Sequence, residues 1–402
     1  MFRGASKIHN CILSIFKVFS LFLFALLLPR LFVTYVNTQS YNNIPLQQTD
    51  FRLGLENISN NLLYTLDKSA NETCNATLIT NHTGKDQLGR TNKDILTAKG
   101  ITIKKIVDPT EIIHQQNFEN IQLIIFDMDI TGIHACEHVN ALFNAIDTAC
   151  ELNKQIIVLD RPNMMGPIIE GPLGKKNHTL KNAVTLVPLR YGMTAGEIAL
   201  FYNNNIRKKP AHLHIVPMKN YIRDNPIAST ALSDTTDLMS CHGHSFLGLL
   251  KEIEPFYVGT ETKSAYQLLL LPEDITFPQA QWQKIHKILQ LYGVKSNFYT
   301  YFNEEKKIHY HGLKIKIENI NYTPLFKLLI HVLNFFKDNG VTLTFSEQFD
   351  QLVGTKEIRK FFKNKISWRK FSKNINKRLY TFYNAASSYF MYKPFPRIEY
   401  LS

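Results

Sequence analysis

The chain has 402 residues, of which 45% are hydrophobic and 12% aromatic, so it can bury a sizeable core, and two domains are the natural expectation. Five irregularly spaced cysteines argue against a disulfide framework. The formal net charge of +13 is concentrated near the C-terminus, because the segment 356–397 holds twelve bases and one acid.

The N-terminal segment has the pattern of an export signal. Arg3, Lys7 and Lys17 precede an uncharged apolar run over 18–29, which Pro29 and Arg30 close. Basic residues followed by an apolar run of this length are typical of a signal peptide or a signal anchor. We therefore expect residues 1–36 to direct export and 37–50 to form a linker. The mature protein would lie in the periplasm or outside the cell, with 11–36 as a membrane anchor if the segment is retained.

Predicted strands and helices alternate over 51–225. The strands are expected at 75–80, 101–109, 121–129, 155–163 and 211–218, and the helices at 94–100, 138–154 and 194–205. Nearly continuous apolar strands separated by helices indicate a largely parallel sheet with helices on both faces. We predict an α/β fold with a Rossmann-like domain over 51–225.

From residue 226 the pattern changes, which predicts a smaller α+β C-terminal domain over 226–392. Residues 309–320 alternate like a strand, and 325–336 have the pattern of a buried helix. The basic tail of this domain carries interleaved aromatic residues, a composition that suits nucleic acid, peptidoglycan acids or anionic lipid. The simpler interpretation is a pair of amphipathic helices with solvated lysines, and we expect no nucleic-acid partner.

Polar side chains follow three of the predicted strands. In parallel sheets the ligand crevice lies beyond the carboxyl ends of the strands, so these side chains should meet at one rim. They are Asn81, Thr83, Asp127, Asp129, Asp160, Arg161 and Asn163. Arg161 and Arg190 each follow a predicted strand, so we expect both to point into the crevice, where two arginines and an amide suit an anionic ligand.

The decapeptide LIIFDMDITG, residues 123–132, is similar to the first motif of haloacid-dehalogenase-type phosphatases. There the first aspartate attacks phosphorus and the second is the general acid. That chemistry also needs a later lysine and a downstream acidic pair at another strand end, and no such acidic pair follows in the chain, so a phosphatase is the least favoured alternative.

Two histidine groups are weak hints of a metal site. They are Cys241–His244 and His309–His311, and structural zinc needs four converging ligands at defined spacing. We expect no metal and no cofactor.

Several short motifs together resemble one family. They are TNHTG, DRPN, EGP and RYGMTAGEIA, and they occur in this order in the NamZ-type exo-β-N-acetylmuramidases. Thr194 and Glu197 in the last motif also form a capping box, which is their simplest function. The resemblance runs from about Leu53 to about Tyr392. It implies a Rossmann-like domain, a smaller C-terminal domain, and hydrolysis of terminal N-acetylmuramic acid from peptidoglycan fragments outside the cytoplasm.

The chain departs from the family pattern where chemistry is expected. The family's Ser-Pro-Glu-His-Gly motif is missing, and Glu111 is the carboxylate nearest to that place. In the family's Phe-Asp-x-Gln-Asp-x-Gly-x-Arg motif, Asp127 and Gly132 match, whereas Asp129 stands at the glutamine. Ile130 stands at the second aspartate.

Two functions of different classes remain open. One is a glycosidase with Glu111 or Asp127 as the catalytic acid, and the other is a catalytically inactive relative that binds a muropeptide or an envelope protein. The resemblance and the strand-end pattern together imply substrate-binding residues, which are Asn81, Thr83, Asp129, Arg161, Asn163, Arg190, Tyr191, Thr194 and Glu197.

Overall fold

A computed structural model describes residues 50–59, 74–109, 118–134, 137–174, 186–224 and 235–402. The expected export segment 1–36 and nearly all of the linker lie outside these residues, so both stay predictions. No helix within the described ranges is long and apolar enough to cross a membrane.

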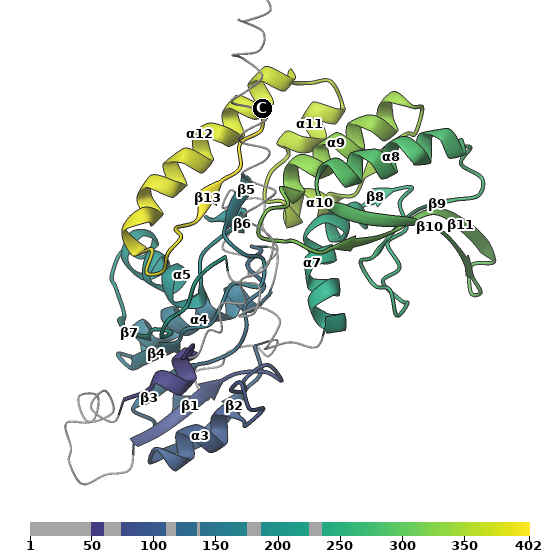
Figure 1. The fold of residues 1–402 in the computed structure, drawn as a ribbon. Coiled ribbons are helices and arrows are strands. Elements are labelled where there is room, and N and C mark those ends of the chain that lie inside the picture. Colours follow the sequence, from purple (N-terminus) through teal and green to yellow (C-terminus); the bar gives the residue numbers. More distant parts are fainter. Residues whose placement is uncertain (1–49, 60–73, 110–117, 135–136, 175–185, 225–234) are drawn as a thin grey trace, which may run out of the picture. The chain divides into compact units, whose positions relative to one another are not determined.

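The first part of the fold is a five-stranded parallel sheet with the order β2-β1-β3-β4-β7 (Figure 1). Its strands are β1 (Cys74–Ile79), β2 (Ile101–Val107), β3 (Leu123–Phe126), β4 (Gln155–Leu159) and β7 (His212–Val216). All four residues of β3 are buried, as the continuous apolar run predicts for a central strand covered on both faces.

Alternate residues of the sheet enter two separate cores. On one face Ile124 and Phe126 pack in the core that contains α4 (Glu137–Glu151) and α5 (Ala195–Phe201). On the other face Ile125 packs in the core that contains Leu96 of α3 (Asn92–Ala98). The short helix η1 (Gly54–Asn57) also covers this second face, and the π-helix η3 (Tyr202–Ile206) continues α5. The predicted α/β class and its parallel sheet are confirmed.

A small three-stranded sheet, in the order β13-β5-β6, joins segments that are distant in sequence. Its strands are β5 (Ile168–Leu173), β6 (Pro188–Tyr191) and β13 (Arg397–Ile398), and helix α12 (Trp368–Ala386) packs against β5. The C-terminal end of the chain therefore returns to the part of the fold that holds the parallel sheet.

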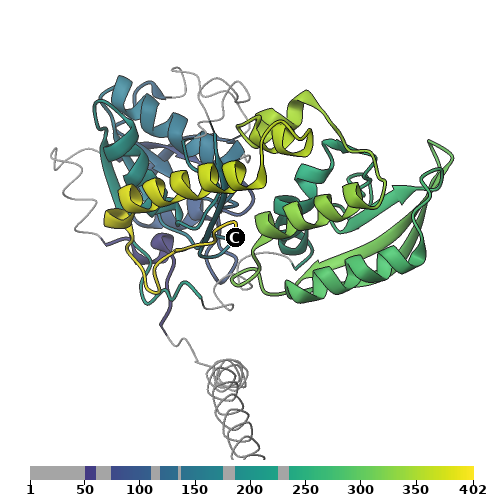
Figure 2. The same ribbon diagram turned by 90° about the horizontal axis from the view of Figure 1, so that it is seen from above.

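The remaining elements combine helices with short antiparallel sheets (Figure 2). Strand β11 (Ile308–Ile317) pairs with β10 (Val294–Asn303) and β9 (Leu268–Pro272), and α9 (Leu325–Asp338) is the predicted buried helix. The other elements are α7 (Thr235–Leu250), β8 (Ile253–Glu254), α8 (Gln279–Leu291), β12 (Thr344–Phe345), α10 (Glu347–Leu352), α11 (Glu357–Phe362) and η4 (Ser387–Tyr389). Residues Asp50–Ser402 group into one compact unit, and the boundary near 225 stays a prediction.

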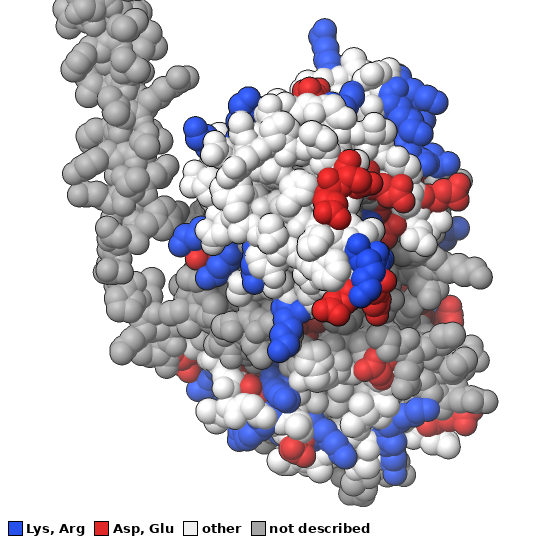
Figure 3. Space-filling view, turned by 90° about the vertical axis from the view of Figure 1, so that its right-hand side faces the viewer, with Lys and Arg blue, Asp and Glu red and all other residues white. Residues whose placement is uncertain are grey.

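Helix α12 is amphipathic, as the basic tail predicted. Phe371, Ile375 and Leu379 recur at four-residue spacing and are buried, whereas Arg369 and Lys373 are exposed. Figure 3 shows the opposite side of the molecule from α12, where Lys and Arg side chains form a group at the upper right and acidic side chains gather near the middle of the upper part.

Candidate active site at the carboxyl ends of the parallel strands

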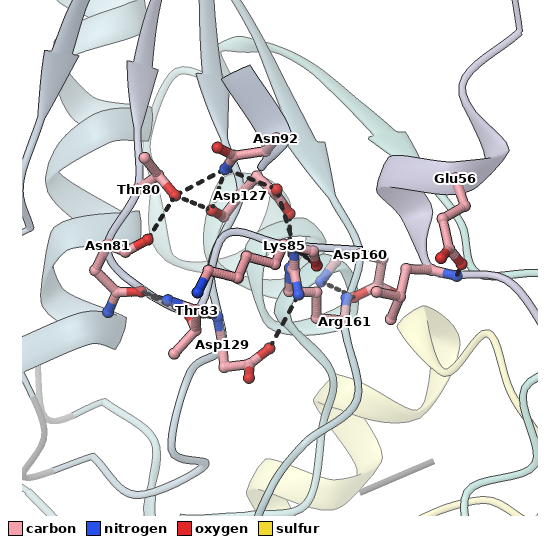
Figure 4. Close-up of polar contacts among 12 residues, drawn as sticks. Glu56, Thr80, Asn81, Thr83, Lys85, Asn92, Asp127, Asp129, Asp160 and Arg161 are labelled. Atoms are coloured by element: carbon pink, nitrogen blue, oxygen red, sulfur yellow. Dashed lines mark hydrogen bonds and ion pairs between the residues drawn. The ribbon is translucent and has the colours of Figure 1, made fainter. Parts of the chain in front are cut away.

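The centre of the candidate site is a buried pair between Asp127, directly after β3, and Arg161, two residues after β4 (Figure 4). Arg161 Nε donates to Asp127 Oδ1 at 2.7 Å and Nη2 donates to Oδ2 at 3.1 Å. Both side chains are 0% exposed. Asn92 Nδ2 donates a further hydrogen bond of 2.9 Å to Asp127 Oδ2. Both oxygens of this carboxylate are thus occupied inside the protein.

The surroundings of Arg161 keep its guanidinium charged. Burial alone would lower the pKa of this group, but the Asp127 and Asp129 carboxylates outweigh burial and raise the pKa above its ordinary value. Arg161 Nη2 also donates a 2.9 Å hydrogen bond to the carbonyl oxygen of Lys85. Arg161 therefore joins the loops that follow β1, β3 and β4.

Asp129 lies beside this pair in different surroundings. Arg161 Nη1 is 3.4 Å from Asp129 Oδ1, whereas Oδ2 is buried and receives no hydrogen bond from the described part of the chain. Burial raises the pKa of the Asp129 carboxyl, the nearby Arg161 lowers it, and the Asp127 charge raises it, with a net rise. Asp127 and Asp129 are two residues apart, but the Asp127 carboxylate accepts more and shorter hydrogen bonds than the Asp129 carboxyl group.

The turn after β1 forms the adjoining edge of the rim. Thr83 Oγ1 donates to Asn81 Oδ1 at 2.6 Å and accepts a 2.9 Å hydrogen bond from the Asp129 backbone N–H. Asn81 and Thr83 are half-buried, and the Lys85 side chain is exposed. In Figure 4 the Lys85 side chain extends toward Thr83. The half-buried amide and hydroxyl groups and the exposed ammonium group here can reach a polar ligand.

Asp160 belongs to a second buried cluster on the α5 side of the sheet. Tyr392 OH donates to Asp160 Oδ2 at 2.6 Å, Thr194 Oγ1 donates to the same oxygen at 3.0 Å, and Gly196 N donates to Oδ1 at 2.7 Å. Burial raises the pKa of Asp160 to about 7, although these donors favour the charged form. Asp160 thus helps to attach the C-terminal segment to the sheet.

The predicted capping box at the start of α5 is confirmed. Thr194 accepts from the Glu197 backbone N–H, and Glu197 Oε2 accepts from the Thr194 backbone N–H. Glu197 Oε1 also pairs with Arg223 at 2.5 Å and accepts from Met391 N at 2.7 Å. Because both side chains are fully buried in these contacts, the geometry explains Thr194 and Glu197 as parts of the fold.

Arg190 does not follow a strand of the parallel sheet, which corrects our expectation that it would point into the crevice. It lies within β6, and its Nη1 pairs with Glu170 Oε1 at 2.9 Å. The same guanidinium donates to the carbonyl oxygens of Met165, Ile320 and Thr323. Burial raises the pKa of Glu170, and the Arg190 charge lowers it, with a net rise. This pair connects β6 and β5 with the segment before α9.

Asn163 and Tyr191 are also committed to internal positions. Asn163 Nδ2 donates to the Met193 carbonyl at 2.7 Å, and Oδ1 accepts from Met165 N at 2.8 Å. Tyr191 is fully buried in β6, and its backbone N–H donates to Gly132 O at 3.3 Å. The loop after β3 therefore lies along β6, and the hydrogen bonds of Asn163 are made within the protein.

Several functional residues were not predicted from the sequence. Glu170, Arg223, Asn92 and Tyr392 hold the predicted residues in place, and of these only Glu170 lies in a motif, EGP, that could have signalled it. The proposed acid Glu111 lies outside the described residues, so its placement stays a prediction. Within the described ranges, no three His, Cys, Asp or Glu side chains gather in a way that could hold a metal ion.

Comparison with known proteins finds a family match over a region that contains most of this rim. Residues 85–236 match the family model described as exo-β-N-acetylmuramidase NamZ, N-terminal. Over this region the chain is similar to the NamZ-type family. The chain is 22% identical over 306 residues to the peptidoglycan β-N-acetylmuramidase NamZ of Bacillus subtilis (strain 168). The alignment covers 73% of each chain.

Solved structures show the same fold as this chain. A DUF1343 family protein of Bacteroides fragilis superposes with a TM-score of 0.71 at 22% identity, over 85% of this chain and 99% of the other. A second DUF1343 family protein of the same organism gives a TM-score of 0.62 at 18% identity, with the same coverage. At these identities the likeness supports the architecture and carries no residue role.

Proposed function

We propose that this chain hydrolyses the glycosidic bond of a terminal N-acetylmuramic acid in peptidoglycan fragments. The family supports this at the level of glycoside hydrolysis of peptidoglycan. The observation that carries the proposal is the pair of neighbouring carboxyl groups, Asp127 and Asp129, which lie in unlike surroundings at the carboxyl ends of a parallel sheet. Ligands bind at this edge in open α/β sheets.

Glycoside hydrolysis normally uses one carboxylic acid to protonate the leaving oxygen and a second group to manage the water or the oxocarbenium face. Two carboxyl groups held in unlike surroundings can provide these two roles. Here Asp127 is fixed by Arg161 and Asn92, whereas Asp129 Oδ2 has no hydrogen-bond partner among the described residues. Glu111, between β2 and β3 in the chain, stays a further candidate acid.

The substrate's lactyl carboxylate needs a cation at the rim. We expected Arg161 and Arg190 to supply it, but both guanidinium groups are buried and paired with Asp127 and Glu170. Lys85 is exposed beside Asn81 and Thr83, so we assign the carboxylate contact to its ammonium group. A solvated lysine on the rim can approach a ligand without breaking a buried ion pair.

A catalytically inactive relative that binds muropeptides is the second candidate. This candidate is favoured because many of the predicted site side chains make their hydrogen bonds within the protein. The guanidinium groups of Arg161 and Arg190 are examples. The phosphatase alternative is less compatible with the geometry, because Asp127, its nucleophile, is 0% exposed and clamped by Arg161.

The test is release of free N-acetylmuramic acid by the purified protein, from a muramyl disaccharide and from a chromogenic N-acetylmuramide. Release from both substrates supports the hydrolase, and Lys85→Ala should raise the KM with little change in kcat. Saturable muropeptide binding without turnover supports the binding protein. Absence of both refutes the two candidates together.

We further propose that the segment 1–36 exports the chain. Cell fractionation should place the protein outside the cytoplasm, and deletion of this segment should retain it inside. A full-length protein found only in the cytoplasmic fraction would refute export.

A further inference from the structure

The two carboxyl groups after β3 offer different chemistry to a ligand. Asp127 accepts hydrogen bonds on both oxygens, from Arg161 at 2.7 Å and 3.1 Å and from Asn92 at 2.9 Å. These donors occupy both carboxylate oxygens of Asp127 and fix the side chain in position, so neither oxygen is directed at a ligand.

Asp129 has the opposite arrangement. Its side chain is 7% exposed, and Arg161 Nη1 is 3.4 Å from Oδ1, the longest of the contacts from this guanidinium to a carboxylate. Oδ2 is buried without a hydrogen-bond partner in the described ranges, and so is Thr131 Oγ1, two residues further along the chain. A buried polar oxygen without a partner is costly, so two of them near each other in sequence at the rim point to a ligand or a proton that completes them.

We propose that Asp129 is the proton donor of this site and that the Asp127–Arg161 pair is the fixed frame that positions it. The inference rests on the proposed hydrolase function. In the reaction, Asp129 gives its carboxyl proton to the glycosidic oxygen while the bond from C1 to that oxygen breaks and its electron pair goes to the oxygen. The oxygen of a water molecule bonds to C1, and the surplus proton of the water restores the Asp129 carboxyl.

The charges around Asp129 allow it to hold that proton. Burial is the largest influence and favours the neutral acid, Arg161 opposes it, and Asp127 favours it. His138 of α4 also faces this group and favours the charged form. The net direction is a raised pKa, as a general acid requires. Glu170 and Asp160 are also buried acids, but internal donors occupy both oxygens of each.

The test compares two leaving groups, because a general acid matters most when the leaving oxygen is a poor one. Asp129→Asn should lower kcat on the muramyl disaccharide about 10²–10⁴-fold, the usual contribution of a positioned acid, and much less on a nitrophenyl muramide. Asp129→Glu should restore part of the disaccharide activity. Asp274→Asn, at an exposed acid between β9 and α8, is the matched control and should change neither rate.

The outcomes separate the inference from the function on which it rests. If wild-type protein cleaves both substrates and Asp129→Asn loses activity equally on both, or on neither, Asp129 is not the proton donor, although the hydrolase function stands. If wild-type protein cleaves neither substrate, the hydrolase proposal fails and takes the role of Asp129 with it. The circular dichroism spectrum of Asp129→Asn must match that of the wild-type protein before a loss of rate supports Asp129 as the proton donor.

Discussion

Replacing Arg161 by methionine tests whether this guanidinium supports the fold or a ligand. The Arg161 side chain is 0% exposed and pairs with both oxygens of Asp127, which is also 0% exposed. Removal of the cation leaves a buried carboxylate without a counter-charge. Breaking a buried pair in this way costs about 3–5 kcal/mol in the free energy of unfolding. Because each kcal/mol lowers the Tm of a chain this large by about 2 °C, we expect a fall of about 6–10 °C.

The assay is thermal and urea unfolding at pH 7, followed by circular dichroism. Arg52→Met is the matched control, because the Arg52 side chain is 51% exposed and pairs with Asp50 at the surface, so its loss should leave the Tm unchanged. An Arg161→Met protein with an unchanged Tm that no longer binds muropeptide would refute the structural role.

Two further predictions concern the support beneath the rim. The raised pKa of Asp160, about 7, means that its contribution to stability is full below the unfolded pKa of about 3.9 and is lost as the pH rises through 7. Tyr392→Phe removes a 2.6 Å donor to Asp160, so the Tm gap from wild type should widen between pH 5 and 8.5, and a constant gap would contradict this assignment. Gly132→Ala places a Cβ at a φ of +76° and 2.0 Å from Asn163 Oδ1, so urea unfolding should show a loss of about 1–3 kcal/mol. Gly89→Ala, at a φ of +79° with open space around it, should lose less, and equal losses would show that the contact with Asn163 does not matter.

The parallel sheet could be predicted because each strand carries its own signal. Ile124, Ile125 and Phe126 point alternately to the two faces of the sheet, and all three are apolar. This pattern is typical of a strand that is covered on both faces. The helix after it follows from the 3.6-residue spacing of Val139, Leu142 and Ile146, all of which are buried. These signals are local, and the structure places each element within a few residues of the prediction.

The second sheet, β13-β5-β6, could not be predicted in the same way. Its strands have 2 to 6 residues, and β13 lies more than 200 residues from its partner β5 in the chain. No local period marks such a pairing, since its stability comes from packing against α12. Arg190 was therefore assigned to the crevice, although it lies in β6 and holds the segment before α9.

The candidate site divides in the same way. The sequence by itself determined which side chains follow β1, β3 and β4, because parallel strands bring their carboxyl ends to one edge. Only the tertiary structure decided which of them a ligand can use. The sequence shows which residues are charged, but it does not show which opposite charge each one pairs with. Arg161 supports the fold because folding buries its guanidinium against Asp127. The same burial left Asp129 Oδ2 without a hydrogen-bond partner among the described residues, and this difference from Asp127 underlies the role proposed for Asp129.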